Sequence, residues 1–373
     1  MEDQGLYRSL FTGRERTGFF EMALLEIDAS GLYCAAGDFY VDPWRGVERA
    51  VITHGHSDHA RWGSGRYLTS AAGVEVVRAR VGEEAPITGV PWGNSVTLNG
   101  VQVSFHPAGH ILGSAQVRVE YRGEIWVISG DYKTEPDATC EAFEPVRCHT
   151  FITEATFGLP LYVWRPQQEI FAEIDAWWRA SQSQGRACVL FAYALGKAQR
   201  LLAGVDSTIG PIAVHGAVHR FVELYRQSGI PLPPVMRGDE AGAAAIRGKG
   251  LVIAPPSAAN STWLRKFGEV STAFASGWMQ VRGIRRRRAA DRGFVLSDHA
   301  DWPGLLDSIE ATGAEHVAVT HGPAIPALVR YLQEERRLDA RALITPYGDD
   351  EETAAAASEE SADSDAEGGP PGA

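Results

Sequence analysis

His54-Gly55-His56-Ser57-Asp58-His59 brings four metal-binding side chains together within six residues. The stretch directly follows the apolar run Ala50-Val51-Ile52, which predicts a strand that ends in the cluster. Neutral imidazole and carboxylate groups are ligands for zinc-class ions. Three histidines and an aspartate packed here without a metal would leave many polar groups unpaired. The stretch therefore predicts a metal centre at the edge of a sheet.

Three further polar residues follow strand-like segments and complete the candidate ligand set. His110 lies in the loop segment 107–114, Asp131 follows the apolar segment 126–130, and His321 follows the segment 317–320. Each is a weak signal by itself, but together they suit two divalent ions. We expect the first ion to be held by His54, His56 and His110, the second by Asp58, His59 and His321, and both by a bridging Asp131.

The composition is that of a globular protein with one large domain or two ordinary ones. The chain has 373 residues, of which 45% are hydrophobic, enough for a sizeable core. Its start, Met1 to Arg16, is too polar and acidic for a signal peptide, and no apolar stretch has the length of a membrane span. Four scattered cysteines without a Cys-x-x-Cys pair are typical of reduced thiols. We therefore expect a cytoplasmic protein that is not associated with a membrane.

The charge is distributed unevenly along the chain. The net charge is −12, but residues 349–373 contain nine acidic and no basic residues, so residues 1–348 carry only −3. This tail has too few apolar residues to fold, and we expect it to be disordered. A basic run, Arg282-Gly-Ile-Arg-Arg-Arg-Arg288, stands against the nearly neutral body. It suits either a solvated face or a contact with a phosphate backbone.

Two patterns of secondary structure succeed one another. Residues 19–155 contain short strands and tight turns, with hairpins expected at Asn99-Gly100 and at Arg122–Glu124. Beyond residue 160, helices alternate with buried strands, which predicts a parallel α/β unit. We expect helices at residues 70–81, 169–183, 196–203, 302–312 and 325–335.

The ligand pattern resembles the metallo-β-lactamase fold superfamily, whose signature is His-x-His-x-Asp-His followed by a lone His, an Asp and a last His. The resemblance implies a mixed α/β (α+β) fold, an αβ/βα sandwich with the metals at the strand ends. It also implies a supporting acid near the first motif. Asp42 occupies that position, and Asp38 is a competing choice.

The spacing of the later motifs is similar to that of the β-CASP nucleases. Asp131 and His321 are 190 residues apart, room for an inserted domain. Ser297-Asp-His299-Ala-Asp301 resembles the Ser-x-His-x-Asp motif of that group, and the segment around Glu154 resembles its acidic motif. The resemblance implies an N-terminal extension (1–18), a metallo-β-lactamase domain (19–160 and 293–348), a β-CASP domain (161–292) and the acidic tail (349–373).

Within this group the chain looks most like the bacterial ligase-associated DNA exonucleases. The segments 130–136, 191–197 and 296–305 carry that match. It implies a DNA-repair nuclease acting on single-stranded DNA or duplex ends, beside an ATP-dependent DNA ligase and an Lhr-type helicase. His321 instead resembles the RNA-processing branch, typified by the cleavage and polyadenylation endonuclease. An RNA-processing nuclease is therefore the alternative.

The implied mechanism is hydrolysis of a phosphodiester bond by a hydroxide generated on two metals, with Zn²⁺ expected and Mn²⁺ as the alternative. Asp58 and Asp131 would serve the metals, and His299 would act as general acid or phosphate ligand, oriented by the second-shell residue Asp301. Four further residues are candidates for binding substrate phosphate or base: Lys197, Ser276, Trp278 and Lys133. An exposed helix lysine, a core tryptophan and a surface ion pair are the simpler interpretations of Lys197, Trp278 and Lys133.

Two other functional classes fit the ligand pattern less well. A small-molecule hydrolase, such as a thioesterase or lactonase, does not need the long insert or the Ser-Asp-His-Ala-Asp motif. A non-catalytic scaffold would be expected to lose ligands, and every expected ligand is present. The sequence leaves cleavage polarity, exonuclease or endonuclease mode and oligomeric state open.

Overall fold

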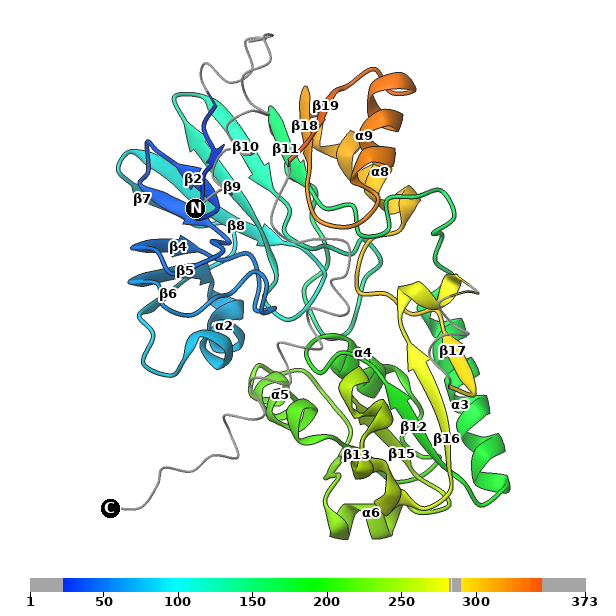
Figure 1. Cartoon of the computed structure of the whole chain (residues 1–373). Coiled ribbons are helices and arrows are strands. Elements are labelled where there is room, and N and C mark those ends of the chain that lie inside the picture. The colour runs from blue at the N-terminus through cyan, green and yellow to red at the C-terminus, as the bar shows by residue number, and fades with distance from the viewer. Residues whose placement is uncertain (1–22, 282, 284–289, 344–373) are drawn as a thin grey trace, which may run out of the picture.

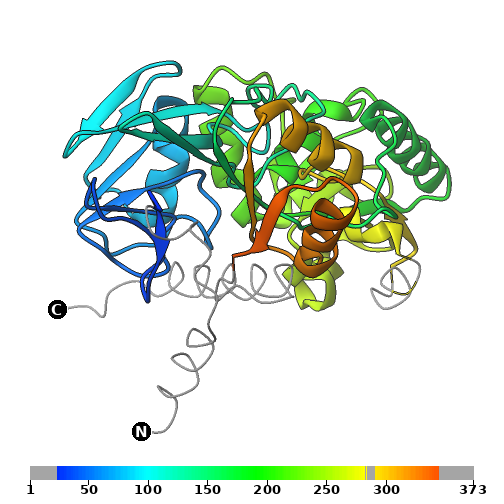
Figure 2. The same cartoon turned by 90° about the horizontal axis from the view of Figure 1, so that it is seen from above.

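The computed structural model describes residues 23–281, 283 and 290–343 (Figure 1). The expected extension 1–18, nearly all of the basic run 282–288 and the expected acidic tail 349–373 lie outside these residues. The described chain forms three sheets with helices on their faces, so the expected α/β class is confirmed. Figures 1 and 2 show the first two sheets together and the third beside them.

The first two sheets face each other across a shared core. The first has the order β1-β2-β3-β4-β5-β6 and the second the order β19-β18-β11-β10-β9-β8-β7. The strands of the first are β1 Glu26–Ile27, β2 Leu32–Cys34, β3 Phe39–Val41, β4 Arg49–Val51, β5 Arg66–Ser70 and β6 Ile87–Val90. Those of the second are β7 Ser95–Leu98, β8 Val101–Pro107, β9 Ala115–Tyr121, β10 Glu124–Ile128, β11 Thr150–Thr153, β18 His316–Val319 and β19 Asp339–Ala342. Side chains such as Val51, Phe105 and Ile128 form one buried cluster between them.

Helices cover the outer faces of both sheets. Val77 of α2 (Val74–Val81) packs with Ile52 and Tyr67 on the first sheet. On the second sheet, α8 (Trp302–Thr312) and α9 (Ile325–Glu334) pack against strand residues such as Phe151 and Val317. The layers therefore run helix, sheet, sheet, helix.

The local signals in this part are confirmed. Asn99 and Gly100 both have positive φ, 47° and 87°, as a two-residue turn between β7 and β8 requires. Arg122 and Gly123 form the second turn in the same way, with Glu124 already in β10. The helix expected from residue 70 divides into a single 3₁₀ turn, η1 Ala71–Gly73, and α2.

The third sheet is parallel throughout and is covered on both faces. Its order is β14-β13-β15-β12-β16-β17. The strands are β12 Ala187–Phe191, β13 Ile212–Val214, β14 Met236–Arg237, β15 Leu251–Ala254, β16 Val270–Ala275 and β17 Arg292–Phe294. The helical segments are α3 Gln167–Ser183, α4 Lys197–Gly204, α5 Gly216–Gln227, α6 Glu240–Ile246, η2 Pro256–Asn260, η3 Thr262–Phe267 and η4 Gly277–Gln280. The expected boundary at residue 292 falls inside β17, which still pairs with β16.

The strand directions bring the candidate residues to one edge. β10, β11 and β18 run parallel, so Asp131, Glu154 and His321 follow the same ends of neighbouring strands. Among the described residues, no helix has both the length and the apolar character needed to cross a membrane.

The cysteines provide a test of the packing. Cys34, Cys148 and Cys188 are buried free thiols, and burial raises the pKa of Cys148 to about 12 and that of Cys188 to about 11. Because the thiolate is the reactive form, these thiols should resist iodoacetamide at pH 7.5 in the folded protein and react on unfolding. Mass spectrometry of the labelled peptides measures this, and rapid labelling of Cys148 or Cys188 before unfolding would contradict the packing.

Candidate metal centre

The ring nitrogens of His56 and His110 face each other in a way that a hydrogen bond cannot explain. His110 Nδ1 lies 2.8 Å from the carbonyl oxygen of Asp298, and His56 Nε2 lies 3.3 Å from that of Leu195. A carbonyl oxygen only accepts, so the proton of each neutral ring is on that outer nitrogen. His110 Nε2 and His56 Nδ1 are then two lone pairs 3.0 Å apart. A cation between them would resolve this arrangement.

His54 contributes a third lone pair to the same point. The hydroxyl of Thr53 donates to the Asp42 carboxylate at 2.6 Å, and its oxygen lies 3.1 Å from His54 Nδ1. Thr53 therefore accepts from His54 Nδ1–H, which leaves His54 Nε2 unprotonated, 3.1 Å from His56 Nδ1. The Gly130 backbone lies close to the Thr53 side chain. Gly130 has a φ of 56°, and a Cβ at this position would lie only 2.8 Å from Thr53 Cβ.

Asp131 lies between this set and a second group. Its Oδ2 is 3.4 Å from His54 Nε2, 3.5 Å from His59 Nε2 and 3.7 Å from His110 Nε2. Its Oδ1 and His59 Nε2 are buried and make no hydrogen bond within the described part of the chain. His59 also faces Asp58 Oδ2 at 3.7 Å, and its ring stacks on that of His321 with centroids 4.9 Å apart. All seven expected ligands thus lie in one connected cluster.

Four of the five imidazoles in the cluster are neutral, as a metal ligand must be, and His59 is the exception. Burial lowers the pKa of His56, and it lowers those of His54 and His110 well below the usual range, so these rings are neutral at neutral pH. Burial also lowers the pKa of His321. Burial disfavours a charge on His59 too, but Asp131, Asp58 and Asp42 outweigh it and raise the pKa of His59 well above its ordinary value. Three carboxylates around one imidazole are an excess of negative charge that a divalent cation would neutralise.

Two residues near His59 hold left-handed backbone conformations. Asp42 has a φ of 43° and His321 a φ of 53°, although neither is glycine. Such conformations cost free energy and cluster at functional sites. Asp42 Oδ2 accepts from His59 Nδ1–H at 2.7 Å, which leaves His59 Nε2 facing Asp131. The competing choice, Asp38, is 58% exposed and pairs with Arg49, so Asp42 is the acid in contact with the cluster.

His299 stands beside the cluster as a cation. Its ring centroid is 4.7 Å from that of His110, and its Nδ1 contacts both Glu154 oxygens at 2.9 and 3.0 Å. Burial alone would lower the pKa of His299, but Glu154 outweighs it and the pKa rises to about 10. At neutral pH His299 is therefore protonated, and its Nε2 lies 4.0 Å from Asp298 Oδ1.

The carboxylate that orients His299 differs from the one expected. Asp301 instead accepts from the backbone N–H groups of Gly304 and Trp164, at 3.0 and 2.8 Å, and so caps α8. An aspartate directly before a helix is drawn to its unpaired N–H groups, which explains the difference. Glu154, expected as a second-shell residue together with Asp42 and Asp301, makes the contact with His299.

The residues expected to bind phosphate already have internal partners. Lys197 begins α4 as expected, but it is 3% exposed and its Nζ lies 3.1 Å from Asp298 Oδ1. Lys133 is 2% exposed and pairs with Glu135 at 3.0 Å. Ser276 caps η4 by accepting from Trp278 N–H. The ring of Trp278 packs against Phe157 in an aromatic group, so phosphate binding by these residues stays a prediction.

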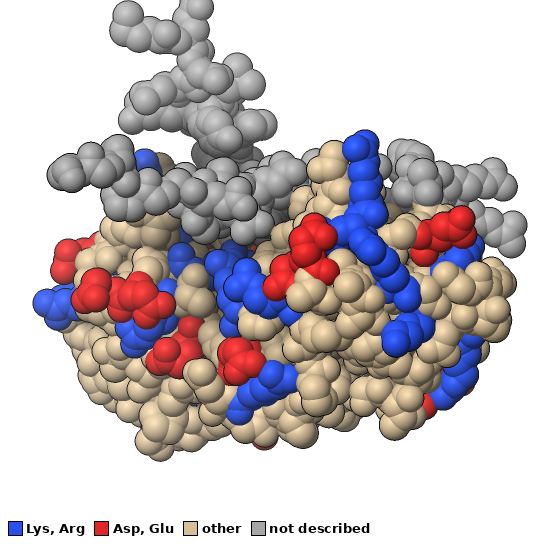
Figure 3. Space-filling model, turned by 90° about the horizontal axis from the view of Figure 1, so that it is seen from below, with Lys and Arg blue, Asp and Glu red and all other residues tan. Residues whose placement is uncertain are grey.

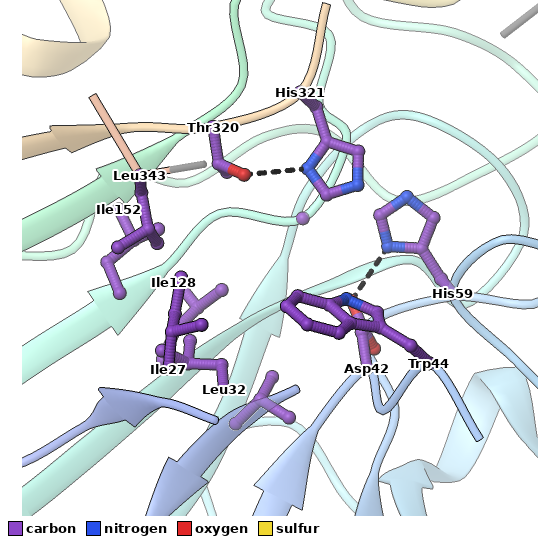
Figure 4. Close-up of a pocket in the computed structure, with 12 residues that line it drawn as sticks. Ile27, Leu32, Asp42, Trp44, His59, Ile128, Ile152, Thr320, His321 and Leu343 are labelled. Carbon is purple, nitrogen blue, oxygen red and sulfur yellow. Dashed lines mark hydrogen bonds and ion pairs between the residues drawn. The ribbon is translucent and has the colours of Figure 1, made fainter. Parts of the chain in front are cut away.

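A small cavity reaches the cluster from the core side. It has a volume of about 40 Å³ and is lined by apolar residues of both facing sheets together with Asp42, His59 and His321. Figure 4 shows the two imidazoles side by side at one end and Ile128, Ile152 and Leu343 at the other. The mainly apolar lining on this side strengthens the electrostatic contacts of Asp42 and His59.

The surface carries charges of both signs. On the face in Figure 3, basic and acidic side chains alternate, and among its described residues they form no broad region of one sign.

Sequence comparisons relate the chain to longer proteins. No family model matches it. It is 32% identical over 295 residues to a protein named probable DNA ligase from Opitutus terrae, covering 78% of this chain and 28% of that protein. It is 29% identical over 119 residues to Endoribonuclease YSH1 of Saccharomyces cerevisiae, covering 31% and 15%. It is also 31% identical over 109 residues to Cleavage and polyadenylation specificity factor 73 of Drosophila melanogaster, covering 29% and 16%. The chain thus spans less than a third of the length of these relatives.

A structural likeness supports the fold alone. A protein of unknown function from Enterococcus faecalis V583 superposes with a TM-score of 0.56 at 9% identity, over 81% of this chain and 80% of that one. Together with the nuclease-named relatives, the His/Asp cluster supports the group of metallo-β-lactamase-fold nucleases with a β-CASP insert. The narrower resemblance to ligase-associated exonucleases remains a prediction.

Sequence reasoning missed several residues that hold the ligands. Thr53 orients His54, and the carbonyl groups of Leu195 and Asp298 orient His56 and His110. Asp298 was detectable because it lies within the His299 motif. Backbone carbonyl groups leave no signal in a side-chain pattern.

The lone-pair arrangement predicts the effect of removing one imidazole. His110→Ala should lower the zinc content of the purified protein by about one equivalent relative to the wild type. The two convergent nitrogens that remain are too few to hold the first ion. His106→Ala is the matched control, since His106 lies on β8 four residues before His110 and its ring contacts the Ser104 hydroxyl. Elemental analysis measures the metal. Equal zinc in the wild type and His110→Ala would contradict the assignment.

Proposed function

We propose that this chain is a two-metal phosphodiesterase of the β-CASP group that hydrolyses DNA as an exonuclease in repair. The observation that carries the proposal is the convergence of the His54, His56 and His110 lone pairs beside Asp131, with the protonated His299–Glu154 pair next to them. On this proposal residues 161–292 form the β-CASP insert, and Zn²⁺ is the expected metal, with Mn²⁺ as the alternative.

The residues divide the chemistry among them. Bound divalent ions would polarise the phosphoryl oxygen and lower the pKa of water to about 7. His54, His56 and His110 would hold the first ion, Asp58, His59 and His321 the second, and Asp131 both. Asp42 accepts from His59 Nδ1–H, so a bound ion that displaced the second proton of the ring would be held at Nε2. Glu154 keeps a proton on His299, which would protonate the leaving oxygen of the sugar from Nε2.

The preference for DNA follows from the extent of the sequence matches. The likeness to the ligase-named protein extends over 78% of the chain, whereas the matches to the yeast and fly RNA-processing proteins cover about 30%. An RNA-processing nuclease is the second candidate, favoured by the endoribonuclease names of those relatives.

An association with a DNA ligase also fits this match. The chain corresponds to 28% of a protein named probable DNA ligase, so most of that protein lies outside the match. We infer that the nuclease acts on ends that a ligase then joins. The association with an Lhr-type helicase stays an expectation from the resemblance.

His299→Ala tests the general acid. Turnover should fall by about 10²–10⁴-fold, as expected for loss of general acid catalysis, while the zinc content stays at the wild-type value. His316→Ala, which breaks an ion pair with Asp339 at the edge of the second sheet, is the control and should retain turnover. Unchanged turnover in His299→Ala would remove His299 from the mechanism.

A substrate panel tests the proposed activity itself. Purified protein with Zn²⁺ or Mn²⁺ is incubated with single-stranded DNA, duplex DNA and matched RNA, each labelled at one end or the other. We expect stepwise shortening of DNA from one end, and the label that is released first gives the polarity. Cleavage of RNA alone would replace the proposal by its second candidate, and no cleavage of any substrate would overturn both.

A further inference from the structure

The third sheet and its helices contact the first metal-ligand set directly, although they belong to a different part of the fold. The turn before α4 supplies the Leu195 carbonyl group that accepts from His56. In the same turn Gly196 lies against Ile111, the residue after His110, and a Cβ on Gly196 would be 2.3 Å from Ile111 Cγ2. The two parts are therefore in close contact at the ligand loops.

Arg200 of α4 makes the strongest of these contacts. Its side chain is 1% exposed, and a guanidinium keeps its charge in a protein, so its burial requires full pairing. Its Nε lies 2.7 Å from Asp137 Oδ2. Its two terminal nitrogens donate to the carbonyl groups of Ser297 at 3.0 Å and of His110 at 3.4 Å. One planar group thus joins three chain segments that are distant in sequence.

Each of the three segments carries a residue of the candidate site. Asp137 lies in the same connection between β10 and β11 as Asp131. Ser297 accepts from the backbone N–H of His299 through its hydroxyl. His110 is itself a ligand. On α5, the Tyr225 hydroxyl accepts from Leu112 N–H at 3.2 Å and holds the other half of the His110 loop.

From these contacts we propose that the third-sheet unit positions the first metal-ligand set, with Arg200 and Tyr225 as the positioning residues. The inference rests on the proposed metal centre. It adds that binding of the first metal depends on how the third-sheet unit packs against the ligand loops. The contacts of both residues are internal to the protein. Both act through the backbone of the His110 loop.

Arg200→Lys separates positioning from charge. The lysine keeps a positive charge beside Asp137, but it lacks the planar fork that reaches two carbonyl groups at once. In the metal-free protein, amide hydrogen exchange of residues 108–114 should be faster by about tenfold or more, because the loop loses its anchor. Zinc affinity for one of the two ions, measured by competition with a chelator, should fall by about 10–100-fold.

Two companion variants make the result decisive. Tyr225→Phe removes the hydroxyl that accepts from Leu112 N–H and should also speed amide exchange of residues 108–114. This variant keeps the inference testable if Arg200→Lys fails to fold. Arg179→Lys alters an exposed arginine–aspartate pair, with Asp206 at 2.6 Å, and should change neither measurement. Wild-type exchange and wild-type zinc affinity in both site variants would overturn the inference. If the wild-type protein binds no zinc, the proposed function fails, and the exchange data still decide the positioning role.

Discussion

Two backbone carbonyl groups fix the chemistry of the candidate site. The oxygens of Asp298 and Leu195 take the outer protons of His110 and His56, so the inner nitrogens of both rings are bare. Thr53 does the same for His54 through its hydroxyl. Without these acceptors the buried imidazoles could choose tautomers that satisfy one another. With them, the bare inner nitrogens can bind only an electron-deficient partner, such as a metal ion. The loops that carry these acceptors therefore decide which nitrogen of each ring is available to that partner.

The electrostatic balance of the site follows from the same commitment. Neutral rings fill one half, whereas His59 stands among Asp42, Asp58 and Asp131 in the other. The protonated His299 has a carboxylate partner of its own, Glu154. One centre thus contains a neutral, an anionic and a cationic region within a few ångströms, which suits a reaction that moves protons around a phosphate.

The sequence predicted what depends on neighbours along the chain. The Asn99-Gly100 turn has the dihedral angles that its residues favour, and the ligands from His54 to His59 lie together because they are adjacent. Side-chain partners far apart in sequence were not predictable. Lys197 begins its helix as expected, yet its ammonium meets Asp298, about a hundred residues away. Asp301 caps a helix instead of orienting His299, because a local N-cap competes with a distant imidazole.

The close approach of Gly196 to Ile111 has a consequence for how such chains diversify. An inserted domain is often regarded as a module that can be exchanged, with the catalytic part left intact. Here the insert supplies a carbonyl acceptor for one ligand and a guanidinium for the loop of another. A chimera that received a foreign insert would have to inherit the facing loop with it. Substitutions on the two sides of this contact are therefore expected to covary, because the insert and the ligand loops must continue to fit each other.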